Sequence, residues 1–255
     1  MKTPAILPSS ILVLALAVGA VAKAPKKSAA QDQPGQATTT TKASAAPSAS
    51  KTSGTSLPDV LHAMDQNAAK FRSAEAEFTW KIYNSVINDF AETDKGKIYF
   101  RRSGNRLQMS AMFTEPSSKQ VIFSGDKVQV LNPGGQVDEY DTTAHKEELE
   151  TFLVLGFGSS GEDLEKSFEV TDLGPEMVGA AKTAKLQLVP KAKNIQDHVP
   201  KILLWIDPTR GISIQQQIFE QSGDYRLATY SNIQLKSVPD SVFKLKGSVK
   251  KTVKH

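Results

Sequence analysis

Cysteine is absent from the 255 residues of this chain. The absence excludes disulfide bonds and thiolate metal sites, and it leaves no residue that could carry a lipid anchor after an export signal. Long hydrophobic runs are also missing. The apolar stretch from Ile11 to Val21 is shorter than the roughly 20 residues that a membrane-spanning helix needs. A folded core must therefore be held together by packing alone.

The middle of the chain has fewer basic than acidic side chains. Residues 57–243 carry 20 basic and 26 acidic side chains, a net charge of −6. Residues 1–56 carry six lysines and one aspartate, and residues 244–255 carry five further lysines. Nucleic-acid binding needs a basic patch on a fold, so no nucleic-acid partner is expected. Two interpretations of the basic ends stay open, solvated tails and weak contact with an anionic membrane surface.

Catalytic motifs are lacking as well. The sequence contains no Gly-x-Ser-x-Gly elbow and no phosphate-binding P-loop. Four histidines are scattered without metal-ligand spacing, at His62, His145, His198 and His255. The acidic cluster of Glu147, Glu148 and Glu150 favours a solvated helix face over an acid–base pair. We therefore expect no enzyme activity, no cofactor and no metal ion.

One glycine pattern needs separate treatment. Residues 156–161, Gly-Phe-Gly-Ser-Ser-Gly, match the spacing of the dinucleotide-binding fingerprint. That fingerprint works between a strand and a long helix inside repeated strand–helix–strand units, and none surround it here. Glu162 and Asp163 would also place negative charge where a phosphate should bind. We interpret the segment as a flexible Gly/Ser hinge that follows a helix.

The composition divides the chain into four parts. Lys2, the apolar run and the small-residue site Ala20-Val21-Ala22 predict a cleaved signal peptide over residues 1–22. Residues 23–56 are rich in Ala, Ser, Thr, Pro and Lys and predict a disordered linker. Residues 57–246 are long enough for one domain, and residues 247–255 form a basic tail.

Within residues 57–246 the periodicity predicts one helix and many strands. Pro58 opens the helix, whose apolar stripe contains Leu61, Met64, Ala68 and Phe71. Alternating apolar residues then predict ten or eleven strands. The segment from His145 to Leu155 has helical composition and interrupts them, and Glu162 to Lys166 predict a further helical turn. We expect an antiparallel sheet that curves to cover its own apolar face.

Four segments, taken in order, resemble the outer-membrane lipoprotein carriers of the LolA-like family. They are Gly96 to Arg102, Gly125 to Pro133, Leu186 to Lys191 and Val238 to Phe243. The chain departs from the family pattern at Ser103, Ser124, Gln129 and Leu131. The resemblance covers about residues 57–246 and implies an α+β, mainly β fold, a strongly curved open half-barrel with an N-terminal helix and a central helical lid.

The resemblance also implies a function. It predicts a periplasmic carrier that shields lipoprotein acyl chains in a hydrophobic cavity and delivers them to the outer membrane. Its partners would be acylated lipoproteins, an inner-membrane release complex and an outer-membrane acceptor, and the carrier would act as a monomer. By resemblance Arg102 gates the lid, because its fixed donor fork can grip backbone carbonyls. A rim arginine that pairs with a carboxylate of the sheet is the competing interpretation. Arg101 should face outward.

The cavity lining is chosen from apolar side chains expected under the lid. The candidates are Phe100, Met109, Phe123, Phe152, Leu153 and Phe157. Packing in the core is the competing explanation for each of them. Three other functions also stay open: a lipid- or lipoprotein-sensing module of the envelope, a general lipid transport protein, and an envelope tether that uses the basic ends.

Overall fold

The computed structural model describes residues 55–246, except 105 and 154, together with residues 250–254. The expected signal peptide and nearly all of the expected linker lie outside the described residues. So do positions 247–249 and 255 of the expected basic tail.

The chain begins its described part with helix α2, Leu57–Lys70. Ser56 and Asp59 form a capping box, in which the backbone N–H of Asp59 donates to Ser56 Oγ over 3.4 Å. Capping of this kind satisfies backbone donors that the first turn leaves without partners. The predicted helix is confirmed, and Leu61 and Met64 of its predicted stripe are buried together with Val60. Ala68 is half-buried, and Phe71 is buried but lies beyond the helix as its C-cap.

Six strands follow α2, and five more follow a short helical insertion. The first group comprises β1 Ser73–Asn84, β2 Asp89–Ser103, β3 Arg106–Glu115, β4 Lys119–Phe123, β5 Lys127–Leu131 and β6 Gln136–Asp141. The second comprises β7 Phe168–Val178, β8 Ala181–Pro190, β9 Ile202–Asp207, β10 Ile212–Phe219 and β11 Tyr225–Gln234. All pairings among these eleven strands are antiparallel. The prediction of an antiparallel, mainly β fold is therefore confirmed.

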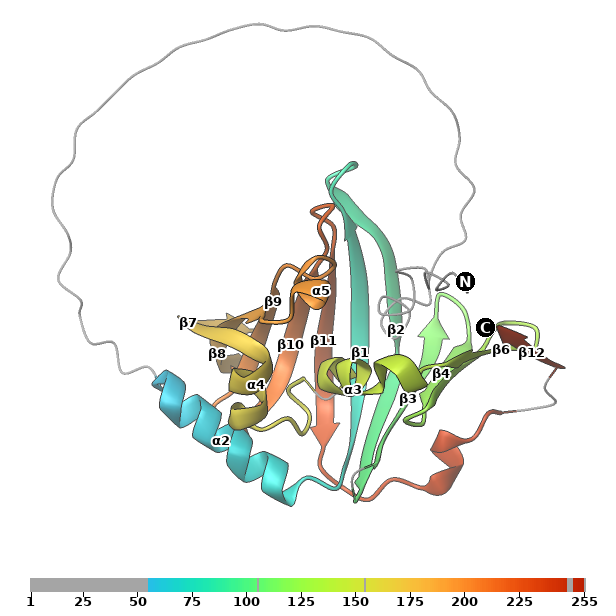
Figure 1. The fold of residues 1–255 in the computed structure, drawn as a ribbon, viewed down its shortest axis with the longest axis horizontal. Helices are drawn as coiled ribbons and strands as arrows, with labels where there is room; N and C mark the ends of the chain where they lie inside the picture. The colour runs from blue at the N-terminus through green and yellow to red at the C-terminus, as the bar shows by residue number, and fades with distance from the viewer. Residues whose placement is uncertain (1–54, 105, 154, 247–249, 255) are drawn as a thin grey trace, which may run out of the picture. The chain divides into compact units, whose positions relative to one another are not determined.

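All strands belong to one sheet, in the order β12-β6-β5-β4-β3-β2-β1-β11-β10-β9-β8-β7. The pairing of β1 with β11 joins the first group to the second in the middle of the sheet (Figure 1). Strand β12, Lys250–Lys254, falls within the expected basic tail and pairs in parallel with β6, so that Lys250 lies opposite Gln136.

The curvature of the sheet differs from the prediction. The sheet stays open, with β7 and β12 at its edges, but it is not strongly curled. We expected strong curvature because a single helix could not cover so wide an apolar face. Instead, three helices together cover this face, since α2, α3 (Lys146–Leu153) and α4 (Gly161–Ser167) all pack on it. Because the helices supply a second layer, the sheet does not need to fold over itself.

The remaining elements are short. They are the 3-10 turns η1, Thr143–His145, and η2, Asp240–Phe243, and helix α5, Lys193–Gln196. Helices α3 and α4 agree with the two helical segments predicted between the strand groups. Across the described ranges, every helix is too short or too polar to cross a membrane.

Candidate functional site

The face of the sheet that the helices cover carries two clusters of buried apolar side chains. The β1–β5 cluster contains Phe71, Ala74, Ala76, Phe78, Ile98, Phe100, Leu107, Met109, Ala111, Phe113, Val121, Phe123, Val128, Val130, Leu149, Leu153, Phe157 and Tyr230. The β8–β10 cluster contains Val60, Leu61, Met64, Phe152, Leu155, Leu164, Phe168, Ala184, Leu186, Leu188, Val199, Ile202, Leu204, Ile206 and Ile218. Alternation along each strand places these side chains on one face.

Helix α3 contributes to both clusters. Leu149 and Leu153, four residues apart on one side of the helix, pack into the β1–β5 cluster. Phe152 packs into the β8–β10 cluster, with its ring edge-on to Phe168 at a centroid distance of 6.3 Å. Figure 1 shows α3 crossing in front of the central strands. The helix thus joins the two halves of the apolar face.

The connection between α3 and α4 enters the apolar face. We call residues 155–159 the plug, because each of them is buried. The ring of Phe157 is fully buried and stacks on Phe100, with centroids 4.9 Å apart and planes 19° apart. Its edge meets the ring of Tyr230, with centroids 4.7 Å apart. The plug therefore packs on the apolar face across the central strands, from Phe100 in β2 to Tyr230 in β11.

The glycines around the plug are explained by close packing. A Cβ on Gly156 would lie 2.1 Å from the Cβ of Ser213 in β10, and the φ of Gly156 is +78°. A Cβ on Gly158 would lie 2.8 Å from the ring of Phe71. A Cβ on Gly161 would lie 2.7 Å from the Cβ of Leu61 in α2. These glycines let three parts of the fold approach the plug. In this structure the glycines serve close packing, and the interpretation as a flexible hinge stays a prediction.

Hydrogen bonds hold both ends of the plug. The backbone N–H of Ser213 donates to the carbonyl of Gly156 over 2.8 Å, and the amide of Gln216 donates to the carbonyl of Leu155. Beyond the other end, Asp65 in α2 accepts the backbone N–H of Gly161, the first residue of α4, over 2.8 Å. Buried backbone groups need such partners, so the plug is a defined part of this structure.

All six predicted cavity residues are buried. Five of them meet in the β1–β5 cluster, namely Phe100, Met109, Phe123, Leu153 and Phe157. The sixth, Phe152, belongs to the β8–β10 cluster. In the closed structure these side chains pack against protein, and three of the six come from α3 and the plug. Their contact with a ligand stays a prediction.

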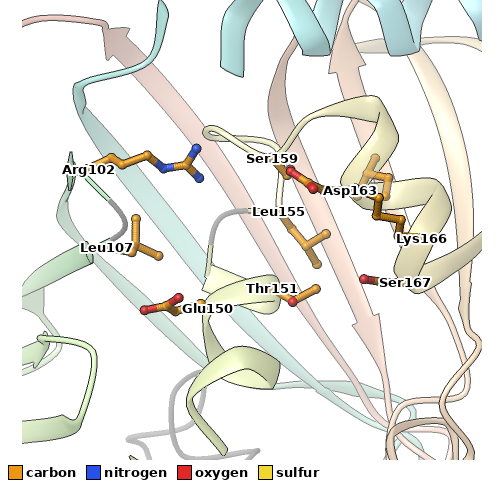
Figure 2. Close-up of a pocket in the computed structure, with 11 residues that line it drawn as sticks. Arg102, Leu107, Glu150, Thr151, Leu155, Ser159, Asp163, Lys166 and Ser167 are labelled. Atoms are coloured by element: carbon orange, nitrogen blue, oxygen red, sulfur yellow. The ribbon is translucent and has the colours of Figure 1, made fainter. Parts of the chain in front are cut away.

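Arg102 lies at the edge of a separate cavity of about 390 Å³, which is also lined by Glu150, Asp163 and Lys166. Figure 2 shows its side chain extending from β2 toward Ser159 and Asp163. Its backbone N–H donates to the carbonyl of Arg72 over 2.8 Å. Among the described residues, its guanidinium has no hydrogen-bond or ion-pair partner. The charged lining suits water and ions better than a hydrocarbon chain.

Arg101 points to the opposite face of the sheet, as predicted. Its guanidinium binds Gln108 Oε1 over 2.7 Å and pairs with Asp240. It also lies over the ring of Phe243, with its central carbon 4.3 Å from the centroid. Arg101 therefore holds the C-terminal segment against the outer face. Of the two arginines, Arg102 is the one that points to the face covered by the helices.

Two residues of the site were missed by sequence reasoning. Tyr230 in β11 is buried beneath Phe157, and burial raises the pKa of its hydroxyl above the usual value. Gln216 in β10 is buried, donates to the plug and lies with its Oε1 3.5 Å from the Tyr230 hydroxyl. Alternation along β10 and β11 could have placed both on the inner face, but nothing in the sequence joined them to residues 155–159.

An open antiparallel sheet whose apolar face is covered by three helices defines the fold of this chain. The chain belongs to the LolA family, because the family model described as outer membrane lipoprotein carrier protein LolA matches residues 69–246. The family is periplasmic, and its members are non-enzymatic carriers that bind lipoproteins. No curated protein matches the chain by sequence.

Solved structures include several distant likenesses. MucB is 11% identical, with a TM-score of 0.48 over 74% of this chain and 63% of that chain. The LolA superfamily protein of Nitrosomonas europaea is 14% identical, with a TM-score of 0.33 over 72% and 97%. The Mycobacterium tuberculosis lipoprotein LppX is 13% identical, with a TM-score of 0.41 over 71% and 98%. The chain thus spans less than two thirds of MucB, which is also known in complex with MucA(peri).

Proposed function

We propose that this protein is an exported periplasmic carrier that takes acylated lipoproteins from an inner-membrane release complex and delivers them to an outer-membrane acceptor. Membership of the LolA family supports the carrier class. The feature that supports acyl-chain binding in this chain is the plug, since residues from the middle of the sequence occupy an apolar face that would otherwise be open.

The plug indicates how a hydrocarbon chain is accommodated. Withdrawal of Phe157 uncovers the rings of Phe100 and Tyr230, and withdrawal of α3 uncovers further apolar side chains of β2 to β4. An acyl chain then replaces the protein's own apolar groups. Each methylene moved from water to an apolar surface contributes about 0.8 kcal/mol, so an acyl chain competes well with one phenylalanine and two leucines.

Competition between the plug and the cargo also provides release. Cargo contacts replace plug contacts, so the net affinity is the difference between the two. A carrier needs this difference to be modest, because it must surrender its cargo to an acceptor. Arg102 faces the charged cavity beside α3 and α4, and there it biases the closed position of the lid.

The experiment is mass spectrometry of material that co-purifies with the exported full-length protein. We expect acylated peptides or intact lipoproteins. The matched control is a cargo whose acylated cysteine is replaced by serine, which should not be retained. Phospholipid as the sole ligand would instead identify a general lipid transport protein. Absence of any acylated ligand, with cargo bound equally well without its acyl chains, would exclude the proposal.

A further inference from the structure

The turn between β1 and β2 carries the most exposed large apolar side chains of the described chain. Val86 is 90% exposed, Ile87 is 60% exposed, and Phe90 at the start of β2 is 38% exposed. We call residues 84–90 the hairpin tip. Figure 1 shows that the tip projects beyond the ends of the neighbouring strands. Adjacent exposed aliphatic residues on a projecting turn indicate a contact surface.

Hydrogen bonds hold the hairpin tip in one conformation. Asn84 Oδ1 accepts the backbone N–H groups of Val86 and Ile87 over 3.0 and 3.2 Å. Asp224 Oδ1, from the turn between β10 and β11, accepts the backbone N–H and the hydroxyl of Ser85, each over 2.7 Å. The tip is thus fixed at its own base and to a second turn, and its aliphatic side chains stay exposed on a rigid support.

An aromatic cluster stands directly behind the tip. Tyr83 stacks on Tyr225 with centroids 4.5 Å apart and planes 11° apart. Phe90 meets both rings edge-on, at 5.8 and 6.0 Å, and Phe219 lies 5.5 Å from Tyr225. These rings pack on one another, so they leave Val86 and Ile87 outside the cluster. Aliphatic side chains thus lie at the end of the hairpin, and aromatic side chains lie next to them. Proteins that bind membranes often have aromatic side chains at the level of the lipid headgroups.

We propose that the hairpin tip inserts shallowly into the surface of a lipid bilayer, with Val86 and Ile87 among the acyl chains and Tyr83 and Tyr225 near the headgroups. A projecting tip can be buried only by a partner that surrounds it, which a fluid bilayer does without a preformed pocket. Residues 84–88 carry no charge, and the first charged residue, Asp89, is acidic. The contact therefore does not depend on anionic lipids. It is also independent of the proposed carrier function, since it requires no cargo.

The test is flotation of the full-length protein with uncharged phosphatidylcholine vesicles. Such vesicles offer nothing to the lysine-rich ends of the chain, which would bind an anionic membrane. Replacing both residues, Val86→Ser with Ile87→Ser, should lower the bound fraction about tenfold or more, because each aliphatic side chain loses its burial in the bilayer. Both positions are exposed, so the variant should fold, which circular dichroism can verify.

A matched control uses two other exposed apolar residues. Leu173 and Met177 in β7 are 48% and 57% exposed, and the double change Leu173→Ser with Met177→Ser should leave vesicle binding unchanged. A second measurement places an indole at the tip with Ile87→Trp, whose emission should shift to the blue when vesicles are added. Equal binding of wild type and tip variant, no binding of wild type, or an unshifted indole would overturn the proposal. Loss of cargo handover in the tip variant without any vesicle binding would also overturn it.

Discussion

The ring of Phe157 stacks on the ring of Phe100 with centroids 4.9 Å apart, although 57 positions separate the two residues in the sequence. The contact closes the apolar face over which we propose that acyl chains bind. Protein and cargo would therefore compete for the same surface. Substitutions can therefore change the affinity for cargo or weaken the contacts that hold the plug and the hairpin tip in place.

Phe157→Ala should open the binding surface. Loss of a fully buried ring should lower the free energy of unfolding by about 3 kcal/mol or more. Removal of the competing ring should at the same time strengthen binding of a fluorescent fatty acid. Urea unfolding and fluorescence titration measure the two effects. Leu188→Ala in the β8–β10 cluster is the control: Leu188 is fully buried, so the change should lose stability without gaining affinity.

Arg102→Leu should slow the release of cargo. Glu150 in α3 and Asp163 in α4 line the same cavity as Arg102, so loss of the positive charge should disfavour the arrangement in which these helices cover the sheet. Charges that line one solvent-accessible cavity without forming an ion pair contribute no more than about 1 kcal/mol, which corresponds to a change of at most about fivefold in transfer to an acceptor. Arg101→Leu, on the opposite face, should leave transfer unchanged. If Arg102→Leu hands over lipoprotein as fast as wild type, the gating role is wrong.

Gly156→Ala should detach the plug from β10. The new Cβ would lie 2.1 Å from the Cβ of Ser213, and the positive φ of this residue adds about 1 kcal/mol of strain. We expect faster hydrogen exchange at residues 155–159 together with tighter fatty-acid binding. Gly179→Ala is the matched control, because its φ of +58° gives similar strain with no atom within 4 Å. Equal exchange in the two variants would mean that the contact with Ser213 does not hold the plug.

Acid should loosen the hairpin tip before the rest of the sheet. Hydrogen bonds from the backbone and hydroxyl of Ser85 lower the pKa of Asp224 below its usual value. The carboxylate form therefore stabilises the folded tip. This contribution is fully present above the unfolded pKa, about 4, and is lost as the pH falls through the lower folded pKa. The protection factors of the amides of residues 84–88, which are corrected for the intrinsic exchange rate at each pH, should fall over this range.

Asp224→Asn supplies the control for that experiment. An amide keeps one acceptor but carries no charge, so the variant should show lower protection factors at the tip at pH 7 and little further change on acidification. Protection factors that fall with acid equally in the variant and in wild type would assign the effect to another group.

Much of the fold could be predicted because its signals are local. Alternation along residues 96–102 predicted which side chains of β2 face inward, and the different faces of Arg101 and Arg102 follow from it. The spacing of Leu61 and Met64 predicted the buried side of α2. The degree of curvature could not be predicted in the same way, because it depends on how many helices cover the sheet, and residue periodicity does not report which surface a helix packs against.

At the candidate site, what the sequence determines and what the tertiary structure decides are easily distinguished. The sequence by itself determined a disulfide-free, antiparallel sheet with one apolar face and a helical interruption, since composition and periodicity are properties of neighbouring residues. Only the tertiary structure decided that Phe157 fills that face between Phe100 and Tyr230, and that the three glycines near it serve close packing instead of nucleotide binding. Those contacts join segments far apart in the chain, and their distances are set by the packing of the whole domain.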